Sequence, residues 1–196
     1  MLRHPGGAIR IIGGQWKRTP LSVIDVPGLR PTPDRVRETV FNWLTHLFGG
    51  SLAGCSALDL FAGTGAMGLE AASRGASPVV LVERDHAALA ALRAIATRLN
   101  ATQVDVLGDD AVSIVRKYVA AGTRFSIIFL DPPFGQGWLP KVLPLTSELC
   151  NSTGVIYAES ETTLEASLLA ACKLELVRAD KAGDVFYHLL RRNNNE

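Results

Sequence analysis

The sequence predicts an α/β fold with a mostly parallel sheet, helices on both faces of that sheet and an antiparallel strand near the C-terminus. Strand-like apolar segments alternate with helix-like segments from residue 56 to residue 171. Parallel strands need a long crossover between them, usually a helix, so this alternation predicts a parallel sheet. Residues 173–192 are then typical of two strands around a turn at 181–184. A tight turn joins only antiparallel strands, which predicts the change of direction at the end of the chain.

The first 50 residues are expected to hold three elements ahead of the sheet. Two short extended segments, residues 10–12 and 18–21, flank Gly13-Gly14 and predict a small hairpin. Residues 27–33 hold three prolines, which favours an extended linker. A helix follows, capped by Thr32 or Asp34 and ended by Gly49-Gly50. Its buried stripe is expected to comprise Val36, Val40, Phe41, Leu44 and Leu47.

The remaining elements are expected in alternation before the final pair of strands. We place strands at 56–61, 79–83, 103–107, 125–130 and 154–160, and helices at 66–74, 86–99, 110–120, 138–150 and 162–171. With 196 residues, 47% of them hydrophobic, the chain can bury one core and carry a small appendage. We therefore expect an N-terminal extension, residues 1–50, packed on a main domain of residues 51–196.

Composition also bounds the compartment and excludes some classes of protein. No apolar stretch approaches the roughly 20 residues that span a bilayer, and the N-terminus lacks the apolar core of a signal peptide. Cys55, Cys150 and Cys172 are widely spaced, which is typical of small buried side chains in a reducing compartment. The four histidines are scattered, so no metal site is expected. These observations predict a cytoplasmic protein without a membrane segment.

Charge is distributed unevenly along the chain. The formal net charge is only +1, but residues 1–40 carry seven basic and three acidic side chains, a net +4 against −3 for the remainder. A basic arm on a mildly acidic body favours contact with a polyanion such as nucleic acid. A solvated N-terminal tail with no partner explains the charge alone equally well.

A glycine-rich segment lies where the first strand of the sheet turns into a helix. Gly63, Gly65 and Gly68 have the G-x-G-x-x-G spacing of a nucleotide-binding loop in Rossmann-like folds. Glu83 ends the next strand about 20 residues further on, where an acid binds ribose hydroxyls. Taken alone, this pattern also suits a nicotinamide-dependent oxidoreductase.

Asp59 argues against a dinucleotide. It lies just before the glycine loop, where its carboxylate would repel a diphosphate. S-adenosylmethionine carries an ammonium and a sulfonium, and its ribose still needs Glu83, so Asp59 suits that cofactor better. Asp109 and Asp110 follow the next strand, where a carboxylate meets an adenine amine, and Asp110 is preferred because it directly precedes the small residue Ala111. Each acid is also explained singly as a helix N-cap.

The segment Asp131-Pro132-Pro133-Phe134 ends the buried strand at 125–130. Two prolines stop the strand and fix a stiff corner at its C-terminal edge, where ligands bind in open α/β sheets. The Asp131 carboxylate and the Pro132 carbonyl form a pair of acceptors that suits a substrate NH₂ group, and Phe134 offers a stacking face. A plain Pro-Pro turn explains the same four residues when they are taken alone.

Together these motifs resemble the class I S-adenosylmethionine-dependent methyltransferases that modify exocyclic amines, and more closely the RsmD family of bacterial small-subunit rRNA methyltransferases. The glycine loop and the segment 131–134 are shared with many methyltransferases and indicate only the class. The segments specific to the family are residues 10–16 (RIIGGQW) and 29–44 (LRPTPDRVRETVFNWL). The resemblance also covers residues 58–76, the strand that ends at Glu83, and residues 156–160. Two departures are modest: Met67 stands where an aliphatic residue is common, and the doublet 109–110 leaves the adenine contact open.

The resemblance implies methylation of the exocyclic N2 amine of a guanine, guanine 966 of 16S rRNA, within the small ribosomal subunit. It also implies a cytoplasmic monomer. Methylation of another amine, in DNA adenine or protein glutamine, is the main alternative. The expected catalytic residues are Asp131, Pro132, Pro133 and Phe134. The expected cofactor-binding residues are Asp59, Phe61, Gly63, Thr64, Gly65, Glu83, Arg84 and Asp110. The expected RNA contacts are Arg10, Trp16, Lys17, Arg18, Arg30, Arg35 and Arg37.

Three of the expected RNA contacts have a structural alternative. Arg35 and Arg37 are also suited to ion pairs with Asp34 or Glu38 along the helix, and i,i+3 spacing favours the Arg35–Glu38 pair. Trp16 either stacks on a base or fixes the hairpin to the main domain.

Overall fold

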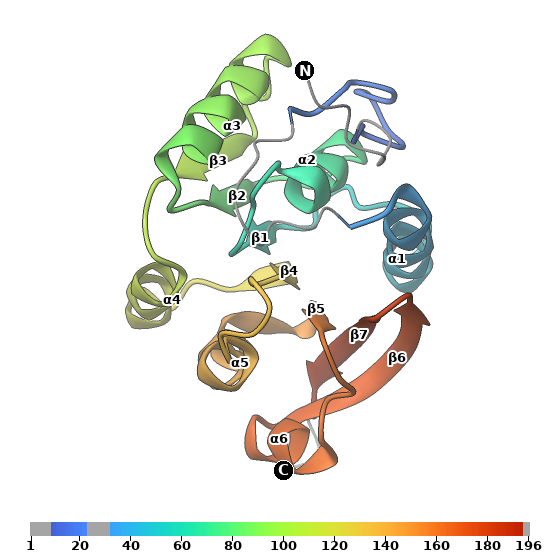
Figure 1. Ribbon diagram of the computed structural model, residues 1–196, viewed down its shortest axis with the longest axis vertical. Helices are drawn as coiled ribbons and strands as arrows, with labels where there is room; N and C mark the ends of the chain where they lie inside the picture. The colour runs from blue at the N-terminus through green and yellow to red at the C-terminus, as the bar shows by residue number, and fades with distance from the viewer. Residues whose placement is uncertain (1–8, 23–31, 194–196) are drawn as a thin grey trace.

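A computed structural model describes residues 9–22 and 32–193 of the chain (Figure 1). Arg30 and most of the predicted linker at 27–33 lie outside the described residues. Within the described part, one sheet of seven strands has the order β3-β2-β1-β4-β5-β7-β6. The strands in that order are Val104–Leu107, Val79–Val82, Ala57–Asp59, Phe125–Leu130, Cys150–Ser160, Val185–Arg192 and Leu174–Ala182.

The first five strands in the chain are parallel, and β7 is antiparallel to both of its neighbours. This arrangement confirms the predicted fold class. The order of the last two strands is a feature that alternation alone does not predict, because β7 enters the sheet between β5 and β6.

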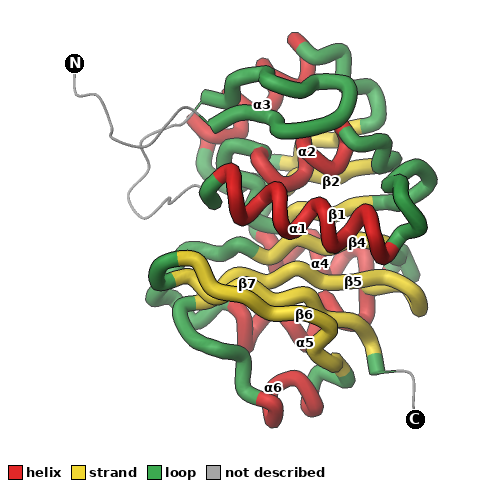
Figure 2. The backbone as a smooth tube through the Cα atoms, turned by 90° about the vertical axis from the view of Figure 1, so that its right-hand side faces the viewer, coloured by secondary structure: helices red, strands yellow, loops and turns green. Residues whose placement is uncertain are grey.

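Helices cover both faces of the sheet, which explains why the central strands β1, β2 and β4 are buried at almost every position. Their bounds are Asp34–Leu47 (α1), Ala66–Ser73 (α2), His86–Arg98 (α3), Ala111–Ala120 (α4), Leu139–Leu149 (α5) and Ala166–Ala171 (α6). Ile127 and Phe129 of β4 face the cluster that includes α1, α2 and α3. Ile128 and Leu130 of the same strand face the cluster that includes α4 and α5. Figures 1 and 2 show α1 and α2 on one side of the sheet and α4 and α5 on the other.

The first helix corrects two predictions. Pro33 occupies the N-cap position and no side chain caps the helix, so neither Thr32 nor Asp34 has the predicted capping role. The Thr32 hydroxyl is instead turned toward two carboxyl groups, described below. Four members of the predicted stripe are buried, but Leu47, the last residue of the helix, is 41% exposed.

The N-terminal segment, residues 9–21, folds back on itself less regularly than a hairpin. Its two arms are antiparallel and meet in a single bridge between Arg10 and Pro20, with backbone bonds between Ile11 and Thr19 on either side of the turn. Ile9, Ile11 and Leu21 join the same buried cluster as α1. The segment is therefore part of the main core rather than a detached arm.

Several element ends differ from the predicted ones. β1 is shorter than predicted, because Leu60 and Phe61 already belong to the turn, and β5 begins four residues earlier. α6 begins at Ala166 rather than at residue 162. None of the helices in the described ranges has the length and apolar character needed to cross a bilayer.

Candidate active site

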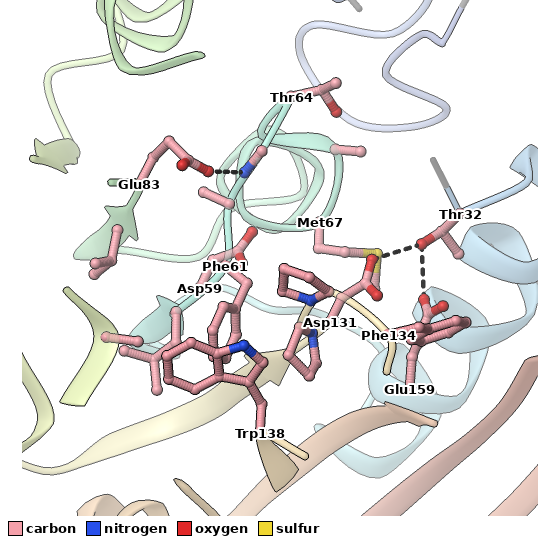
Figure 3. Close-up of a pocket in the computed structure, with 18 of the residues that line it drawn as sticks. Thr32, Asp59, Phe61, Thr64, Met67, Glu83, Asp131, Phe134, Trp138 and Glu159 are labelled. Carbon is pink, nitrogen blue, oxygen red and sulfur yellow. Dashed lines mark hydrogen bonds between the residues drawn. The ribbon is translucent and has the colours of Figure 1, made fainter. Parts of the chain in front are cut away.

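The site lies at the C-terminal ends of β1 and β4, the two central strands. Helices leave these strands toward opposite faces, so a crevice opens between them at the sheet edge. A cavity of about 470 Å³ occupies this place, within the usual size range for small-molecule sites (Figure 3). All predicted catalytic residues and all predicted cofactor-binding residues except Gly65 line it.

The glycine turn brings the backbone of α2 close to β1 and β2. Gly65 is the N-cap of α2 in a left-handed conformation (φ 79°), and Gly63 also has a positive φ of 51°. A Cβ atom on Gly68 would lie 2.1 Å from a methyl carbon of Leu81, closer than real contacts allow. Gly63 and Gly65 therefore allow the turn, and Gly68 allows the helix to pack closely on the strand.

Asp59 is buried beneath the glycine turn. Its Oδ2 accepts a hydrogen bond from the Gly68 amide at 3.0 Å. Burial raises the pKa of Asp59 to about 7, against the hydrogen bonds from the Gly68 and Phe61 amides and with a smaller contribution from the charge of Glu83. A cation bound in the cavity would stabilise the ionised form.

Glu83 and its neighbours form the next part of the wall. Glu83 accepts hydrogen bonds from the Gly63 amide at 2.8 Å and the Asp85 amide at 2.7 Å, which fixes the carboxylate at the mouth of the glycine turn. The Arg84 guanidinium lies 5.7 Å from the centre of the Trp138 ring, and the Phe61 and Trp138 rings meet edge to face at 5.5 Å. Trp138 was not predicted to line the site.

Asp110 caps the N-terminus of α4, which is one of the two roles predicted for it; the other is contact with the adenine of the cofactor. Its Oδ1 accepts from the amides of Val112 at 2.9 Å and Ser113 at 3.3 Å, and Asp109 accepts from the Asp110 amide at 2.7 Å. Both aspartates line the cavity. A cap and a cofactor contact are compatible, so the adenine contact of Asp110 stays a prediction.

Two further polar groups lie beside the predicted catalytic corner. Thr32 and Glu159 are buried, and the Thr32 hydroxyl lies 2.7 Å from Oε1 of Glu159 and 3.2 Å from Oδ2 of Asp131 (Figure 3). Tyr157 donates its hydroxyl hydrogen to the same Oε1 at 2.7 Å. Burial, and then the charges of Glu159 and Asp59, raise the pKa of Asp131 well above its usual range.

Neither Thr32 nor Glu159 was predicted as a site residue. The only sequence signal for Glu159 was a carboxylate at the end of a strand otherwise buried and apolar, which is the same signal that Asp59 and Asp131 give. Although eight acidic residues line the cavity, the residues that the structure describes contain no group of three His, Cys, Asp or Glu side chains arranged to hold a metal ion.

The predicted RNA contacts separate into exposed and buried residues. Arg10, Lys17 and Arg18 are exposed and line a second hollow, of about 620 Å³, together with Arg74. Trp16 is half-buried and packs against the main core, which favours the interpretation that it fixes the segment to the domain. Its role in RNA contact stays a prediction.

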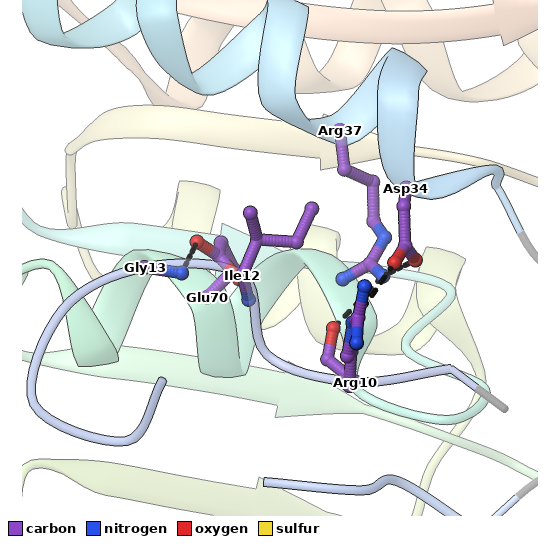
Figure 4. A network of polar contacts seen from close by, with 6 residues as sticks. All are labelled: Arg10, Ile12, Gly13, Asp34, Arg37 and Glu70. Atoms are coloured by element: carbon purple, nitrogen blue, oxygen red, sulfur yellow. Dashed lines mark hydrogen bonds and ion pairs between the residues drawn. The ribbon is translucent and has the colours of Figure 1, made fainter. Parts of the chain in front are cut away.

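Arg37 is wholly buried, so it cannot reach a phosphate at the surface. Its Nη2 pairs with Oδ1 of Asp34 at 2.6 Å and donates to the Arg10 carbonyl at 2.9 Å (Figure 4). The RNA contact predicted for Arg37 is therefore corrected to a structural role, joining α1 to the N-terminal segment. Arg35 is exposed on the same helix, and the i,i+3 pair that α1 contains is Asp34–Arg37 rather than the expected Arg35–Glu38.

Glu70 of α2 binds the backbone of the N-terminal segment. Its buried carboxylate accepts from the amides of Ile12 at 2.6 Å and Gly13 at 2.8 Å (Figure 4). It also accepts from Nε of Arg74 at 2.6 Å. The backbone that carries Arg10, Lys17 and Arg18 beside the second hollow is therefore held to α2 by hydrogen bonds.

The sheet order, the glycine turn and the acids at the strand ends define a class I methyltransferase. Comparison with known proteins agrees. The family model described as "Conserved hypothetical protein 95" matches residues 9–191. Ribosomal RNA small subunit methyltransferase D of Escherichia coli is 41% identical over 192 residues, covering 96% of this chain and 93% of its own. The chain therefore belongs to the RsmD family, and the predicted resemblance is confirmed.

Solved structures support the same assignment. A candidate methyltransferase from Escherichia coli superposes with a TM-score of 0.79 at 37% identity, covering 96% of this chain and 100% of the other. A candidate methylase from Haemophilus influenzae gives a TM-score of 0.72 at 27% identity, covering 95% and 99%. The predicted class of enzyme, a methyltransferase that uses S-adenosylmethionine, is confirmed at this level.

Proposed function

We propose that this protein transfers a methyl group from S-adenosylmethionine to the exocyclic N2 amine of guanine 966 in 16S rRNA. Membership of the RsmD family supports action on small-subunit rRNA. The observation that carries the choice of an amine is the Asp131 corner, which lines one cavity with the glycine turn and Asp59. A carboxylate and a carbonyl side by side are acceptors for the two hydrogens of one NH₂ group.

The residues of the cavity suit this cofactor better than a dinucleotide. Asp59 faces the place where a diphosphate would lie, and its carboxylate suits an ammonium or sulfonium instead. Glu83 is held by two backbone amides at the mouth of the glycine turn, where ribose hydroxyls bind in this fold. Asp110 and the Arg84–Trp138 pair border the remaining space, where they would contact the adenine. When bound, the cofactor supplies an electrophilic methyl group whose bonding electrons return to sulfur.

The chain's own residues have to bind and orient the base. The guanine amine is a poor nucleophile because its lone pair is delocalised into the ring. Donating its two hydrogens to Asp131 and the Pro132 carbonyl draws the nitrogen toward a tetrahedral shape and localises the lone pair. Phe134 stacks on the base, which has to leave its own stack to enter the cavity. Alignment of the two reactants supplies most of the rate, up to about 7–11 kcal/mol in well-oriented pairs.

The exposed basic residues around the second hollow would bind the RNA backbone. Arg10, Lys17 and Arg18 have the exposure and charge to neutralise phosphates, while base selection belongs to the cavity. We propose that the protein acts as a cytoplasmic monomer on rRNA within the small ribosomal subunit, with residues 1–50 as the RNA-binding extension of the 51–196 methyltransferase domain.

The test is methylation of rRNA from cells that lack the activity, using a labelled methyl donor and mapping of the modified nucleotide. Label on N2 of guanine 966 is the expected result. Label on another base, or none on RNA, would refute the proposal. Asp131→Ala should lower the rate by about 10²–10³, comparable to the loss of one preorganised polar contact. Calorimetry with S-adenosylhomocysteine should show binding, and NAD should show none.

A further inference from the structure

The hydroxyl group of Thr32 lies close to two carboxyl groups at the predicted catalytic corner. Thr32 lies between Glu159 and Asp131, with its Oγ1 at 2.7 Å from the first and 3.2 Å from the second (Figure 3). A threonine hydroxyl carries one hydrogen and accepts through its lone pairs. It therefore donates to only one of the two carboxyl groups at a time.

The distances identify the group that accepts from Thr32. The shorter contact goes to Glu159, whose Oε1 also accepts from the Tyr157 hydroxyl at 2.7 Å. Two donors on one oxygen stabilise the ionised form of Glu159. The contact between Thr32 and Asp131 is then a hydrogen bond only when Asp131 carries a proton and donates it to Oγ1.

The surroundings favour one proton on this pair of carboxyl groups. Burial and the charge of Glu159 raise the pKa of Asp131, and burial raises the pKa of Glu159 against its hydrogen bonds from Thr32 and Tyr157. The other titratable or charged groups that face the pair come from neighbouring elements: Asp59 from β1, Tyr157 from β5, Tyr187 from β7, and, around Tyr187, Asp180 of β6 and Arg35 of α1.

We propose that Thr32 and Glu159 form a proton relay for Asp131 during methyl transfer. This inference rests on the proposed function. The methylated amine loses a proton, and a new O–H bond forms at Oδ1 of Asp131. Oδ2 of Asp131 passes its own proton to Oγ1 of Thr32, which passes its hydroxyl proton to Oε1 of Glu159. The electron pair of each broken bond stays on the atom that loses the proton, so the products are a neutral amine and a protonated Glu159.

Glu159→Gln separates the relay from an effect of charge alone, because glutamine keeps an oxygen for Thr32 and Tyr157 to donate to. In the relay, either Asp131 or Glu159 has to be ionised before the pair can accept the proton of the methylated amine, and Glu159 is the more acidic of the two. Without it, Asp131 itself has to ionise. We expect the acid limb of the single-turnover rate to move to higher pH by about one unit, with a rate about tenfold lower at neutral pH.

The opposite result is equally clear. If Glu159 acts only through its charge, removing that charge lowers the pKa of Asp131 and moves the acid limb to lower pH. If the acid limb of the rate in Glu159→Gln moves to lower pH, or does not move, the relay is wrong. Thermal melting of the variant shows whether it is folded.

Substitutions at Thr32 test the relay independently. Thr32→Val removes the hydroxyl at nearly constant volume, and we expect at least a roughly tenfold lower single-turnover rate with unchanged affinity for S-adenosylhomocysteine. Thr32→Ser keeps the hydroxyl and should recover the rate to within about threefold. Thr39→Val is the matched control, because the Thr39 hydroxyl donates to the Arg35 carbonyl along α1 at 3.0 Å. Equal rates for Thr32→Val and Thr32→Ser contradict the relay.

A measurement on the ligand-free protein needs no turnover. The infrared carbonyl band of protonated carboxyl groups at neutral pH should be weaker in Asp131→Asn than in the wild type, and the band that remains should come from Asp59, whose pKa is about 7. A band of equal strength in the two proteins overturns the relay. The proposed function and the relay are refuted by different results. A fully active Asp131→Ala refutes the proposed function itself. An inactive Asp131→Ala beside a fully active Thr32→Val refutes the relay alone.

Discussion

Replacing Glu70 by glutamine should destabilise the protein more than any exposed substitution, because its carboxylate joins two parts of the chain. Oε1 of Glu70 accepts from the Gly13 amide and from Arg74, and Oε2 accepts from the Ile12 amide. Glutamine can place its oxygen toward the first two donors. Its NH₂ group then faces the Ile12 amide, and two donors meet without an acceptor.

The expected magnitude follows from that geometry. Loss of a hydrogen bond to a charged acceptor costs about 1.5–3 kcal/mol, and a buried donor left without a partner costs about 1–3 kcal/mol. Arg74, 80% buried, also loses its counter-ion. We expect the free energy of unfolding to fall by about 3–5 kcal/mol. The loss is smaller if residues 9–21 detach on their own, because local opening then limits the penalty.

Urea unfolding and hydrogen exchange distinguish these outcomes. A global loss shifts the urea midpoint, whereas local detachment speeds exchange at the Ile12 and Gly13 amides and leaves the sheet protected. Glu148→Gln, at an exposed position of α5, is the matched control. A Glu70→Gln variant within about 0.5 kcal/mol of the wild type, with unchanged exchange at both amides, would refute the role assigned to Glu70.

Three further predictions concern the buried arginine, the glycine turn and the cofactor cavity. Arg37→Met should lower the free energy of unfolding, measured in urea, by only about 1–2 kcal/mol, because Asp34 is exposed enough to be hydrated. Its affinity for RNA in filter binding should stay within about twofold of the wild type. A large, salt-dependent loss of RNA affinity would support the phosphate contact first predicted for Arg37. Gly68→Ala should lower the free energy of unfolding by about 1–3 kcal/mol, because its Cβ would overlap Leu81; a neutral urea curve would contradict this packing. Affinity for S-adenosylhomocysteine, measured by calorimetry, should be full above pH 7 and fall about tenfold per pH unit below it, because the pKa of Asp59 is about 7 and its ionised form binds the ammonium. Asp59→Asn should bind weakly at every pH. If the affinity of Asp59→Asn depends on pH as steeply as that of the wild type, Asp59 is not the group responsible.

The sequence predicted the elements of the fold better than their arrangement. Strand and helix alternation depends on local apolar patterns, which single segments carry. The insertion of β7 between β5 and β6 depends on pairing across the whole sheet, and no local pattern records it. The same limit explains Leu47, which continues the apolar spacing of α1 but is exposed at the end of the helix, one turn after the buried Leu44.

The candidate site shows the same division. The motifs that end strands β1, β2 and β4 converge on one cavity, because parallel strands present their C-terminal ends at a common edge. Thr32 was missed because it is 99 residues from Asp131 and reaches it only through the packing of α1. Arg37 was misassigned because a charge in a sequence does not show whether its side chain is exposed, and the burial of Arg37 is set by tertiary structure.

Charge segregation connects the cavity to the surface around it. The cavity is lined by eight acidic residues and one arginine. The hollow beside the N-terminal segment is lined by four basic residues, Arg10, Lys17, Arg18 and Arg74, and by two acidic ones, Asp34 and Glu38. A phosphate near Asp59 and the ionised Glu159 would be repelled, and the excess of basic side chains in the hollow would repel a cationic cofactor. The acidic cavity therefore admits an uncharged base with its backbone held outside, so the charge pattern itself favours a nucleotide turned out of its stack as the substrate.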